Sequence, residues 1–449
     1  MKKLHIILLT AAVLLSLGAS AQSFRSGYFL DNYTYGYRIN PAQVNDRGFF
    51  AIGLGNIDLQ NCTNLGISKF LFPKQDGTGL VTGLNKSVSA DTFLGGLKQN
   101  NFVSLDENIN ILSFGIANGE RMHSVELNLR VPITLNLPLD IFAFAKTGGT
   151  RDFNIAGIYV DVTALADLSY GYSRYITDNL SVGGRLHLLA GAANVNLSGQ
   201  NTRISLSESK IAVSPNLDLV TSGILGIEAN STGDGIDPSK IGINTSSPIG
   251  GFGGTIDLGV EYKADFGLDA MFSITDLGFI SWKNDFAANA SGSFEYTGTT
   301  IGFEGGTIKT DLADLMDVSK ILSFKAGKGT SSASLMPFDI AAGVRYFMPF
   351  YDKLSVGALA TYHNAKYASW FDTRVGATIT PARILSLSGN IGYGSFGGTW
   401  GAGLNLHLGP INLLVGADSF LGRMGRIANI TVPIDPVQVN LHAGLCITL

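Results

Sequence analysis

The feature that most constrains this chain is a two-residue alternation of apolar and polar side chains, which runs from Pro337 to the C-terminus. One such segment places Trp400, Ala402, Leu404, Leu406 and Leu408 on one face and Asn405 and His407 on the other. A β-strand directs successive side chains to opposite faces, so this period predicts strands with one apolar face. After Ala21 no apolar run reaches the ~20 residues that a membrane-spanning helix needs. If the chain crosses a bilayer, it must therefore cross with strands.

The composition indicates that the apolar faces meet lipid. Charged residues make up 15% of the chain and glycine occupies 56 of 449 positions, against averages of about 25% and about 7%. A soluble β-sandwich also alternates, but its outward face is heavily charged. Here the polar face is mostly Gly, Ser, Asn and Thr, which suits a barrel lumen. We therefore predict an all-β fold, a closed antiparallel transmembrane β-barrel in contact with outer-membrane lipid.

Compartment and charge agree with that prediction. The basic start Met1-Lys2-Lys3, the apolar run from Leu4 to Leu17 and the small residues Ala19-Ser20-Ala21 form a secretory signal, with cleavage expected after Ala21. We therefore assign residues 1–21 as signal peptide and residues 49–449 as barrel, located in the bacterial outer membrane. The formal net charge of −4 and the pI of 5.9 give no basic surface for nucleic acid.

The spacing of the alternating segments predicts about 14 strands, within a range of 12 to 18. Long insertions rich in Ser, Asn, Gly and Thr alternate with short turns. The largest insertions are Lys74 to Asn108, Gln200 to Gly254 and Asn284 to Pro337. Long loops on one side and short turns on the other are typical of outer-membrane barrels, with the long loops outside.

Residues 22–48 precede the first strand, which we expect to start near Phe49. Their aromatic content is too high for a free tail in the periplasm, as the short run from Tyr33 through Tyr35 to Tyr37 shows. Pro41 removes a backbone donor and biases Asn40 to an extended conformation. We expect a turn there and burial of the segment in the nearest cavity, the barrel lumen.

Two short motifs resemble a known group of barrels. Asn40-Pro41-Ala42, just before the first strand, resembles the N-terminal region of the outer-membrane long-chain fatty-acid transporter superfamily. The stretch from Ser273 to Trp282 is similar to the S-x-x-D-L-G-x-x-x-W pattern of related barrels. Those barrels include the shuttle component of type IX secretion and a sister family of unassigned role. The resemblance implies a 14-stranded barrel whose lumen is closed by a hatch, here residues 22–48, with Tyr35, Tyr37, Asn40, Pro41 and Ala42 in it.

The chain also departs from the transporters. Gln43-Val44 follows the Asn-Pro-Ala triplet, where the transporters usually carry Ala-Gly or Ala-Ala, and no Phe- and Leu-lined pocket is recognisable. Strand periodicity instead predicts a hydrated, mixed-charge lumen. Its predicted members are Arg185, His187, Asp257, Glu261, Asp269, Asp339, Arg345 and His407.

We find no enzymatic or cofactor-binding pattern. The six histidines show no metal-ligand spacing and no serine stands with a base in a readable catalytic arrangement. We therefore expect no cofactor, no metal and no catalytic residue. Cys62 and Cys446 fall near the ends of the first and last strands. Because neighbouring strands run antiparallel, we expect them roughly 25 Å apart, as two free thiols.

Two functions remain open at this stage. The first is passive or ligand-gated passage of a small apolar or amphipathic solute, controlled by the hatch. The second is a non-conducting barrel that serves as a binding or assembly partner of a secretion or surface-attachment system. Conductance of the purified protein separates the two.

Overall fold

The computed structural model describes residues 24–53, 55–74, 79–147, 151–206, 211–214, 216–226, 242–243, 248–291, 294–296, 302–304, 307–309, 325–327, 329–427 and 430–449. The predicted signal peptide, residues 1–21, lies outside them. The described chain is mainly antiparallel β-structure with a few short helices. Within these ranges, no helix combines the length and the apolar character that crossing a membrane requires.

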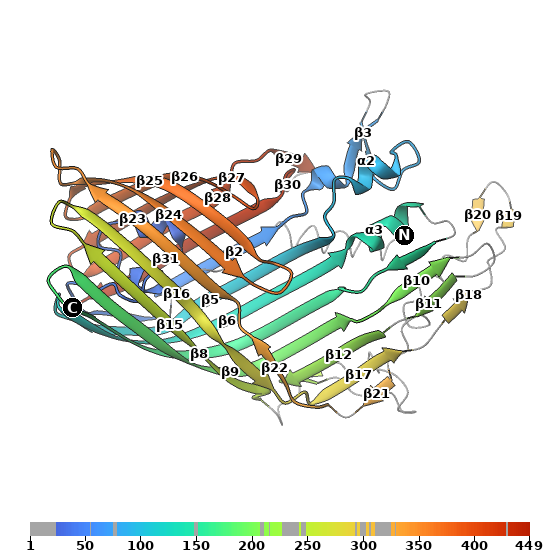
Figure 1. Ribbon diagram of the computed structural model, residues 1–449, viewed down its shortest axis with the longest axis horizontal. Helices are drawn as coiled ribbons and strands as arrows, with labels where there is room; N and C mark the ends of the chain where they lie inside the picture. The colour runs from blue at the N-terminus through green and yellow to red at the C-terminus, as the bar shows by residue number, and fades with distance from the viewer. Residues whose placement is uncertain are drawn as a thin grey trace.

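A closed ring of strands forms the body of the molecule (Figure 1). Its elements are β1 (Phe49–Ile52), β2 (Asn56–Thr63), β5 (Asn100–Ala117), β6 (Arg121–Pro138), β8 (Tyr159–Tyr175), β9 (Leu180–Gly199), β12 (Asn216–Gly223), β15 (Gly251–Lys263), β16 (Leu268–Trp282), β17 (Phe286–Ser291), β21 (Lys325–Gly327), β22 (Ser332–Leu335), β23 (Phe338–Phe347), β24 (Leu354–Asn364), β25 (Trp370–Ala382), β26 (Leu385–Gly394), β27 (Gly397–Leu408), β28 (Ile411–Phe420) and β31 (Val437–Thr448). Four ring positions are shared by consecutive elements: β1 with β2, β12 with β15, β16 with β17, and β21 with β22 and β23. The ring closes where β1 and β2 pair with both β5 and β31, which gives the predicted 14-stranded barrel.

The strand faces follow the alternation in the sequence. Leu188, Ile391 and Tyr393 point out of the barrel and are exposed on its surface, whereas Asn390 and Ser388 point inward and are buried. An exposed apolar exterior and a buried polar interior are the reverse of a soluble sandwich. This arrangement places the outward band against lipid in the outer membrane.

On one side of the barrel, the wall strands extend further into the predicted outside loops than the sequence indicates. The segment from Gln200 to Gly254 is predicted to be an outside loop, but β12 continues the wall there, paired with both β9 and β17. β17, β21 and β22 likewise lie within the predicted insertion Asn284 to Pro337. The prediction is wrong for these stretches because their strands are short and separated by insertions, so the two-residue period is interrupted.

The remaining elements are η3 (Ile67–Lys69), β3 (Leu71–Pro73), β4 (Leu80–Thr82), α2 (Ala90–Leu94), α3 (Leu139–Thr147), β7 (Asp152–Asn154), β10 (Arg203–Leu206), β11 (Ile211–Ser214), β13 (Leu225–Gly226), β14 (Gly242–Ile243), β18 (Phe294–Tyr296), β19 (Gly302–Glu304), β20 (Thr307–Lys309), β29 (Met424–Ile427) and β30 (Ile430–Pro433). Most of them lie at the outer end, opposite the short turns, whereas β13 and β14 belong to the excursion between β12 and β15, which leaves the wall beside Ala192 of β9. Two 3-10 helices, η1 (Arg25–Phe29) and η2 (Gly36–Arg38), precede the barrel.

The two cysteines lie in separate surroundings. Cys62 packs with Phe102 and Trp370 in a buried apolar cluster. Cys446, on the last strand, is buried near Asn412 of β28. Both are free thiols.

We predict that neither thiol reacts with a maleimide in the folded protein, because each cysteine is only 2% exposed. Unfolding in denaturant should then allow two labels per chain, counted by intact mass. A native mass lower by two hydrogens, which signals a disulfide, would contradict the strand order of the barrel.

Candidate functional site in the barrel lumen

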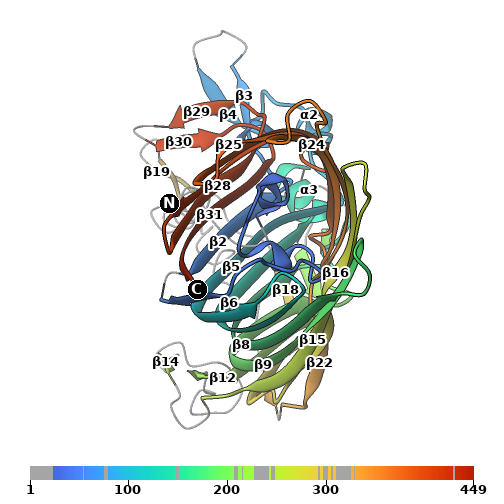
Figure 2. The ribbon, with the colours of Figure 1, turned by 90° about the vertical axis from the view of Figure 1, so that its left-hand side faces the viewer.

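The N-terminal segment, residues 24–48, lies inside the ring of strands (Figure 2). Its aromatic and aliphatic side chains form one buried cluster with the inner face of the wall, and Phe24, Phe29 and Tyr35 are at most 1% exposed. Burial of large rings on this scale stabilises the segment in place, since each fully buried apolar side chain contributes about 1.5–3 kcal/mol. The segment therefore fills the part of the lumen it crosses.

Asn40-Pro41-Ala42 forms a tight turn against two wall strands. The Asn40 side chain accepts a hydrogen bond from the Ala42 amide at 3.1 Å and donates one to the Val260 carbonyl at 3.3 Å. The turn fits because the wall carries glycine here. A methyl group added at Gly183 would lie 2.0 Å from the Pro41 carbonyl oxygen, and one added at Gly259 would lie 2.2 Å from Asn40 Oδ1.

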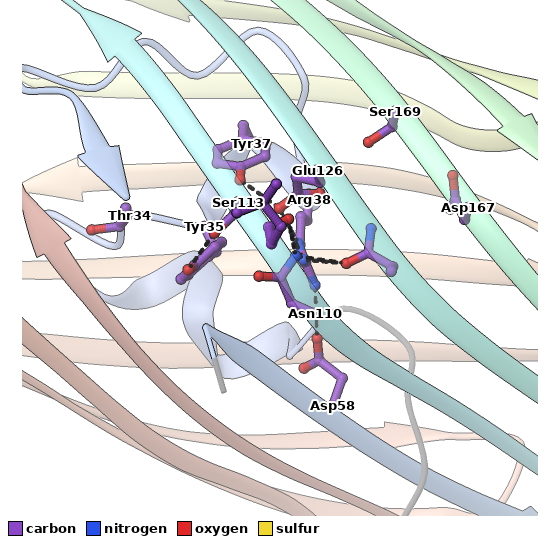
Figure 3. A network of polar contacts seen from close by, with 12 residues as sticks. Thr34, Tyr35, Tyr37, Arg38, Asp58, Asn110, Ser113, Glu126, Asp167 and Ser169 are labelled. Atoms are coloured by element: carbon purple, nitrogen blue, oxygen red, sulfur yellow. Dashed lines mark hydrogen bonds and ion pairs between the residues drawn. The ribbon is translucent and has the colours of Figure 1, made fainter. Parts of the chain in front are cut away.

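Tyr35, Tyr37 and Arg38 fasten the segment to the neighbouring part of the wall, at β2, β5 and β6 (Figure 3). The Tyr35 hydroxyl lies 3.0 Å from Ser113 Oγ, and the Tyr37 hydroxyl donates to Glu126 at 2.6 Å. Burial, and then the negative charge of Glu126, raise the pKa of Tyr37 well above its usual range, so the hydroxyl keeps its proton and remains a donor.

Arg38 is the charged centre of this contact. Its guanidinium donates to Glu126 at 2.9 and 3.1 Å, to Asn128 at 3.0 Å and to Asp58 at 3.4 Å. Arg38, Asp58 and Glu126 are all buried or nearly so. Buried charges of this kind require partners, because leaving one unpaired is strongly destabilising.

The first half of the segment has its own anchors on β25 and β28. The backbone amides of Arg25 and Ser26 donate to Asp418, at 3.1 and 3.4 Å, and the Ser26 hydroxyl donates to the same carboxylate. The Arg25 guanidinium lies 3.7 Å from Asp372 and 4.6 Å above the Trp370 ring. The segment is thus tied to the wall at both ends.

Three of the predicted lumen residues come together beside Arg38. Arg185 pairs with Glu126 and lies 3.5 Å from Asp257. His187 bridges two carboxylates, with Asp167 at 3.0 Å and Asp257 at 3.0 Å. A cavity of about 60 Å³ lies among these side chains and Asp106. This charged cluster therefore leaves room for little more than a water molecule or two.

Of the other five predicted residues, Asp339 also borders this cavity, and four lie elsewhere around the barrel. Arg345 pairs with Asp31 of the N-terminal segment, and Asp339 contacts His363 at 2.8 Å. Glu261 lies 3.6 Å from Lys263, Asp269 is opposite Arg345 in the strand register, and His407 contacts Asn412. Glu261, Asp269, Arg345 and His407 are not among the residues that line the cavity beside Arg185.

In the described part of the chain, the one group of side chains spaced to hold a metal ion already makes hydrogen bonds and ion pairs within the protein. Among the described residues, His187, Asp257 and Asp276 bring ligand atoms within 4.8 Å of one another. Asp276, however, receives two hydrogen bonds from Arg130, at 2.7 and 3.2 Å, and both ring nitrogens of His187 face carboxylates. The arrangement is better described as a network of ion pairs than as a metal centre.

Several central residues are missing from the sequence prediction. Glu126 and Arg130 belong to an alternating stretch of β6 that would have revealed them. Asp276 lies in the S-x-x-D-L-G-x-x-x-W pattern, whose Ser, Asp and Trp residues each contact another part of the barrel interior. Ser273 donates to the Ile39 carbonyl at 2.7 Å, Asp276 (φ 64°) binds Arg130, and Trp282 packs on the strand backbone at Gly191.

We predict that Gly183→Ala and Gly259→Ala each displace the Asn40-Pro41-Ala42 turn, because the added methyl groups would overlap it. Limited trypsin digestion followed by mass spectrometry should then show cleavage after Arg38. Gly389→Ala is the matched control, since nothing lies within 4 Å of that position. Equal resistance of all three variants would contradict the fit of the turn to the wall.

We further predict that Arg38→Ala lowers the free energy of unfolding by roughly 3–5 kcal/mol, because Glu126 and Asp58 lose a buried partner. Arg423→Ala removes an exposed ion pair with Asp435 and should leave the free energy of unfolding nearly unchanged, because exposed ion pairs contribute little. Denaturant titration of both variants in detergent compares the two. Similar losses would show that Arg38 is no stronger an anchor than a surface arginine.

Comparisons with known proteins give one family assignment and several distant structural matches. The toluene transporter TodX of P. putida matches at 10% identity, over 97% of this chain and 99% of that chain, with a TM-score of 0.43. A FadL homologue of Pseudomonas aeruginosa matches at 12% identity, over 97% of each chain, also with a TM-score of 0.43. The translocator domain of the autotransporter NalP from Neisseria meningitidis matches at 10% identity, over 91% of each chain, with a TM-score of 0.37.

The barrel of this chain is established by its own strand pairing. No curated protein matches the sequence. The model of a family of unknown function, DUF5723, matches residues 41–418. This match spans most of the barrel and the turn at Pro41, so the chain belongs to the DUF5723 family.

Proposed function

We propose that this protein is a gated passage for a small amphipathic or apolar solute across the outer membrane, and that the N-terminal segment is its hatch. The observation that carries the proposal is the manner in which the segment is held. It occupies part of the lumen ahead of β1 and contacts the wall mainly through side chains, and residues 24–48 take no part in a strand ladder. Side-chain contacts can be replaced one at a time by contacts with a solute. The backbone hydrogen bonds of a strand ladder are harder to replace in this way.

The chemistry of the lumen favours an amphipathic solute over a purely apolar one. Displacing the segment would expose the inward-facing groups of the wall, among them Glu126, Asp372 and Asp418, which are buried in the docked state. It would also vacate the space filled by the aromatic rings of the segment. A solute with an apolar body and a polar end matches both surfaces, because the polar wall groups keep hydrogen-bond partners.

A second function is that of a binding partner in a secretion or surface-attachment system. Apolar side chains at the outer end of the barrel favour it. Phe70, Phe72, Phe93 and Phe142 form an aromatic cluster around α2 and α3, with ring centroids 5.8–6.4 Å apart. Leu80 and Leu84 of the same region are exposed. Apolar residues in solvent at this end provide a contact surface for another protein.

Planar-bilayer recordings decide between the two. We predict that the native chain is closed and that Gly183→Ala/Gly259→Ala, which displaces the turn, opens a steady conductance that decanoate, an amphipathic probe, reduces from the outer side. Gly389→Ala should stay closed. A displaced turn without conductance would count against passage and favour the partner-binding function.

A further inference from the structure

Two arginines and a histidine gather on the outside of the barrel, where β6 and β8 meet the short turns. Arg121 is directly opposite Arg174 in the strand register, and His123 is opposite Tyr172. The side chains of Arg121, His123 and Arg174 are exposed. We refer to these three residues as the basic edge cluster. It lies apart from the lumen and from the contacts of the N-terminal segment.

The alternation of the two strands fixes the direction in which the cluster points. Met122 lies between Arg121 and His123, and it is 2% exposed and packs with the cluster of buried residues inside the barrel. Ser173, next to Arg174, is also buried and donates a hydrogen bond to the N-terminal segment. Because successive side chains of a strand point to opposite faces, the three members of the basic edge cluster point outward, toward the membrane.

Arg121 and Arg174 place two positive charges against each other. Residues directly opposite on one face have Cβ atoms about 4.5–5.5 Å apart, and like charges in that position destabilise a sheet. Within the described part of the chain, the Arg174 guanidinium donates only to the neighbouring Tyr175 carbonyl, at 3.4 Å. Glu120 and Asp178 lie in the adjoining turns, and neither carboxylate forms an ion pair with these arginines. An anion bound between the two guanidiniums would relieve the repulsion.

Two tyrosines hold the histidine of the cluster in place. His123 Nδ1 lies 2.8 Å from the hydroxyl of Tyr170, and the ring of Tyr172 lies against the imidazole with centroids 4.8 Å apart. Tyrosine rings are enriched at the level of lipid headgroups, since one end of the ring is apolar and the other is polar. The position of His123 is thus set before any ligand arrives.

The apolar band of the wall begins immediately beyond the cluster. Val125 and Leu168 follow on β6 and β8, Leu186 lies beside Tyr170 on β9, and all three are exposed on the outer surface. Below the cluster are the turns at 118–120 and 176–179, at the end of the barrel that faces the periplasm in outer-membrane proteins. The cluster therefore lies at the boundary between the acyl chains and the headgroups of the inner leaflet.

We propose that the basic edge cluster binds the headgroup phosphate of an anionic phospholipid, phosphatidylglycerol. Arginine forks match phosphate oxygens in pairs of hydrogen bonds, so Arg121 and Arg174 can share one phosphate. The acyl chains then lie along Val125, Leu168 and Leu186. Charge decides the headgroup, because the ammonium of a zwitterionic lipid would add a third positive charge beside the two arginines. The site lies outside the lumen and does not depend on whether the barrel conducts.

Native mass spectrometry of the purified protein in detergent micelles tests this proposal. Phosphatidylglycerol should bind more tightly than phosphatidylcholine with the same acyl chains. Arg121→Ala/Arg174→Ala should weaken the binding of phosphatidylglycerol by roughly tenfold, because two basic side chains at the lipid surface are lost, and should remove the preference between the two lipids. Heat-dependent migration on electrophoresis checks that the variant is folded.

Lys353→Ala/Arg383→Ala is the matched control. It removes two exposed basic residues from other short turns and changes the net charge by the same amount. It should leave the binding of phosphatidylglycerol unchanged. Glycerol 3-phosphate, which has the phosphate without acyl chains, should not compete at the concentration of the lipid. The proposal is overturned if the native protein shows no preference, if the control weakens binding as much as Arg121→Ala/Arg174→Ala, or if glycerol 3-phosphate competes equally.

Discussion

The structure depends on one constraint: a backbone inside a bilayer must satisfy its hydrogen bonds internally. Strands meet that constraint only when the sheet closes on itself, so the last strand has to return to the first. Here β31 returns to β1 and β2 and is fully paired on its β28 side. The outward apolar band, the short turns and the inward polar face are all consequences of this closure.

The closed ring creates a second problem, which the N-terminal segment solves. Carboxylates on the inner wall are cut off from bulk water and need positive partners. Arg38 of the segment reaches Glu126 and Asp58, and Arg25 lies beside Asp372. In the opposite sense, Asp31 of the segment pairs with Arg345 of the wall. The segment and the wall are therefore complementary in charge at three separate places, which gives the segment a single position and orientation.

Much of the fold was predictable from local pattern. The period of two identified most wall strands, because the two sides of each strand face lipid and lumen and are chemically distinct. Asn40-Pro41-Ala42 and the cluster of tyrosines indicated a buried segment ahead of Phe49. The short, interrupted strands β12, β17, β21 and β22 escaped prediction, since a few residues between insertions do not establish a period.

The site was only partly predictable. Arg185, His187 and Asp257 were assigned to the lumen face from alternation, yet nothing in their spacing indicated that they share carboxylates with Arg130 or Arg38. The partners are far apart in the sequence. Arg130 and Asp276, for example, are separated by 146 residues. Contacts across a barrel depend on the shear and tilt of the whole ring, which no short window of sequence contains.

By itself, the sequence determined that the chain forms membrane-spanning strands, where most of them lie, which of their faces is polar and that an aromatic segment precedes them. These properties follow from side-chain period and composition, which are local. Only the tertiary structure decided which charges meet and how the Pro41 turn fits over Gly183 and Gly259. Those outcomes depend on closing the ring, a step in which residues at the two ends of the chain first become neighbours.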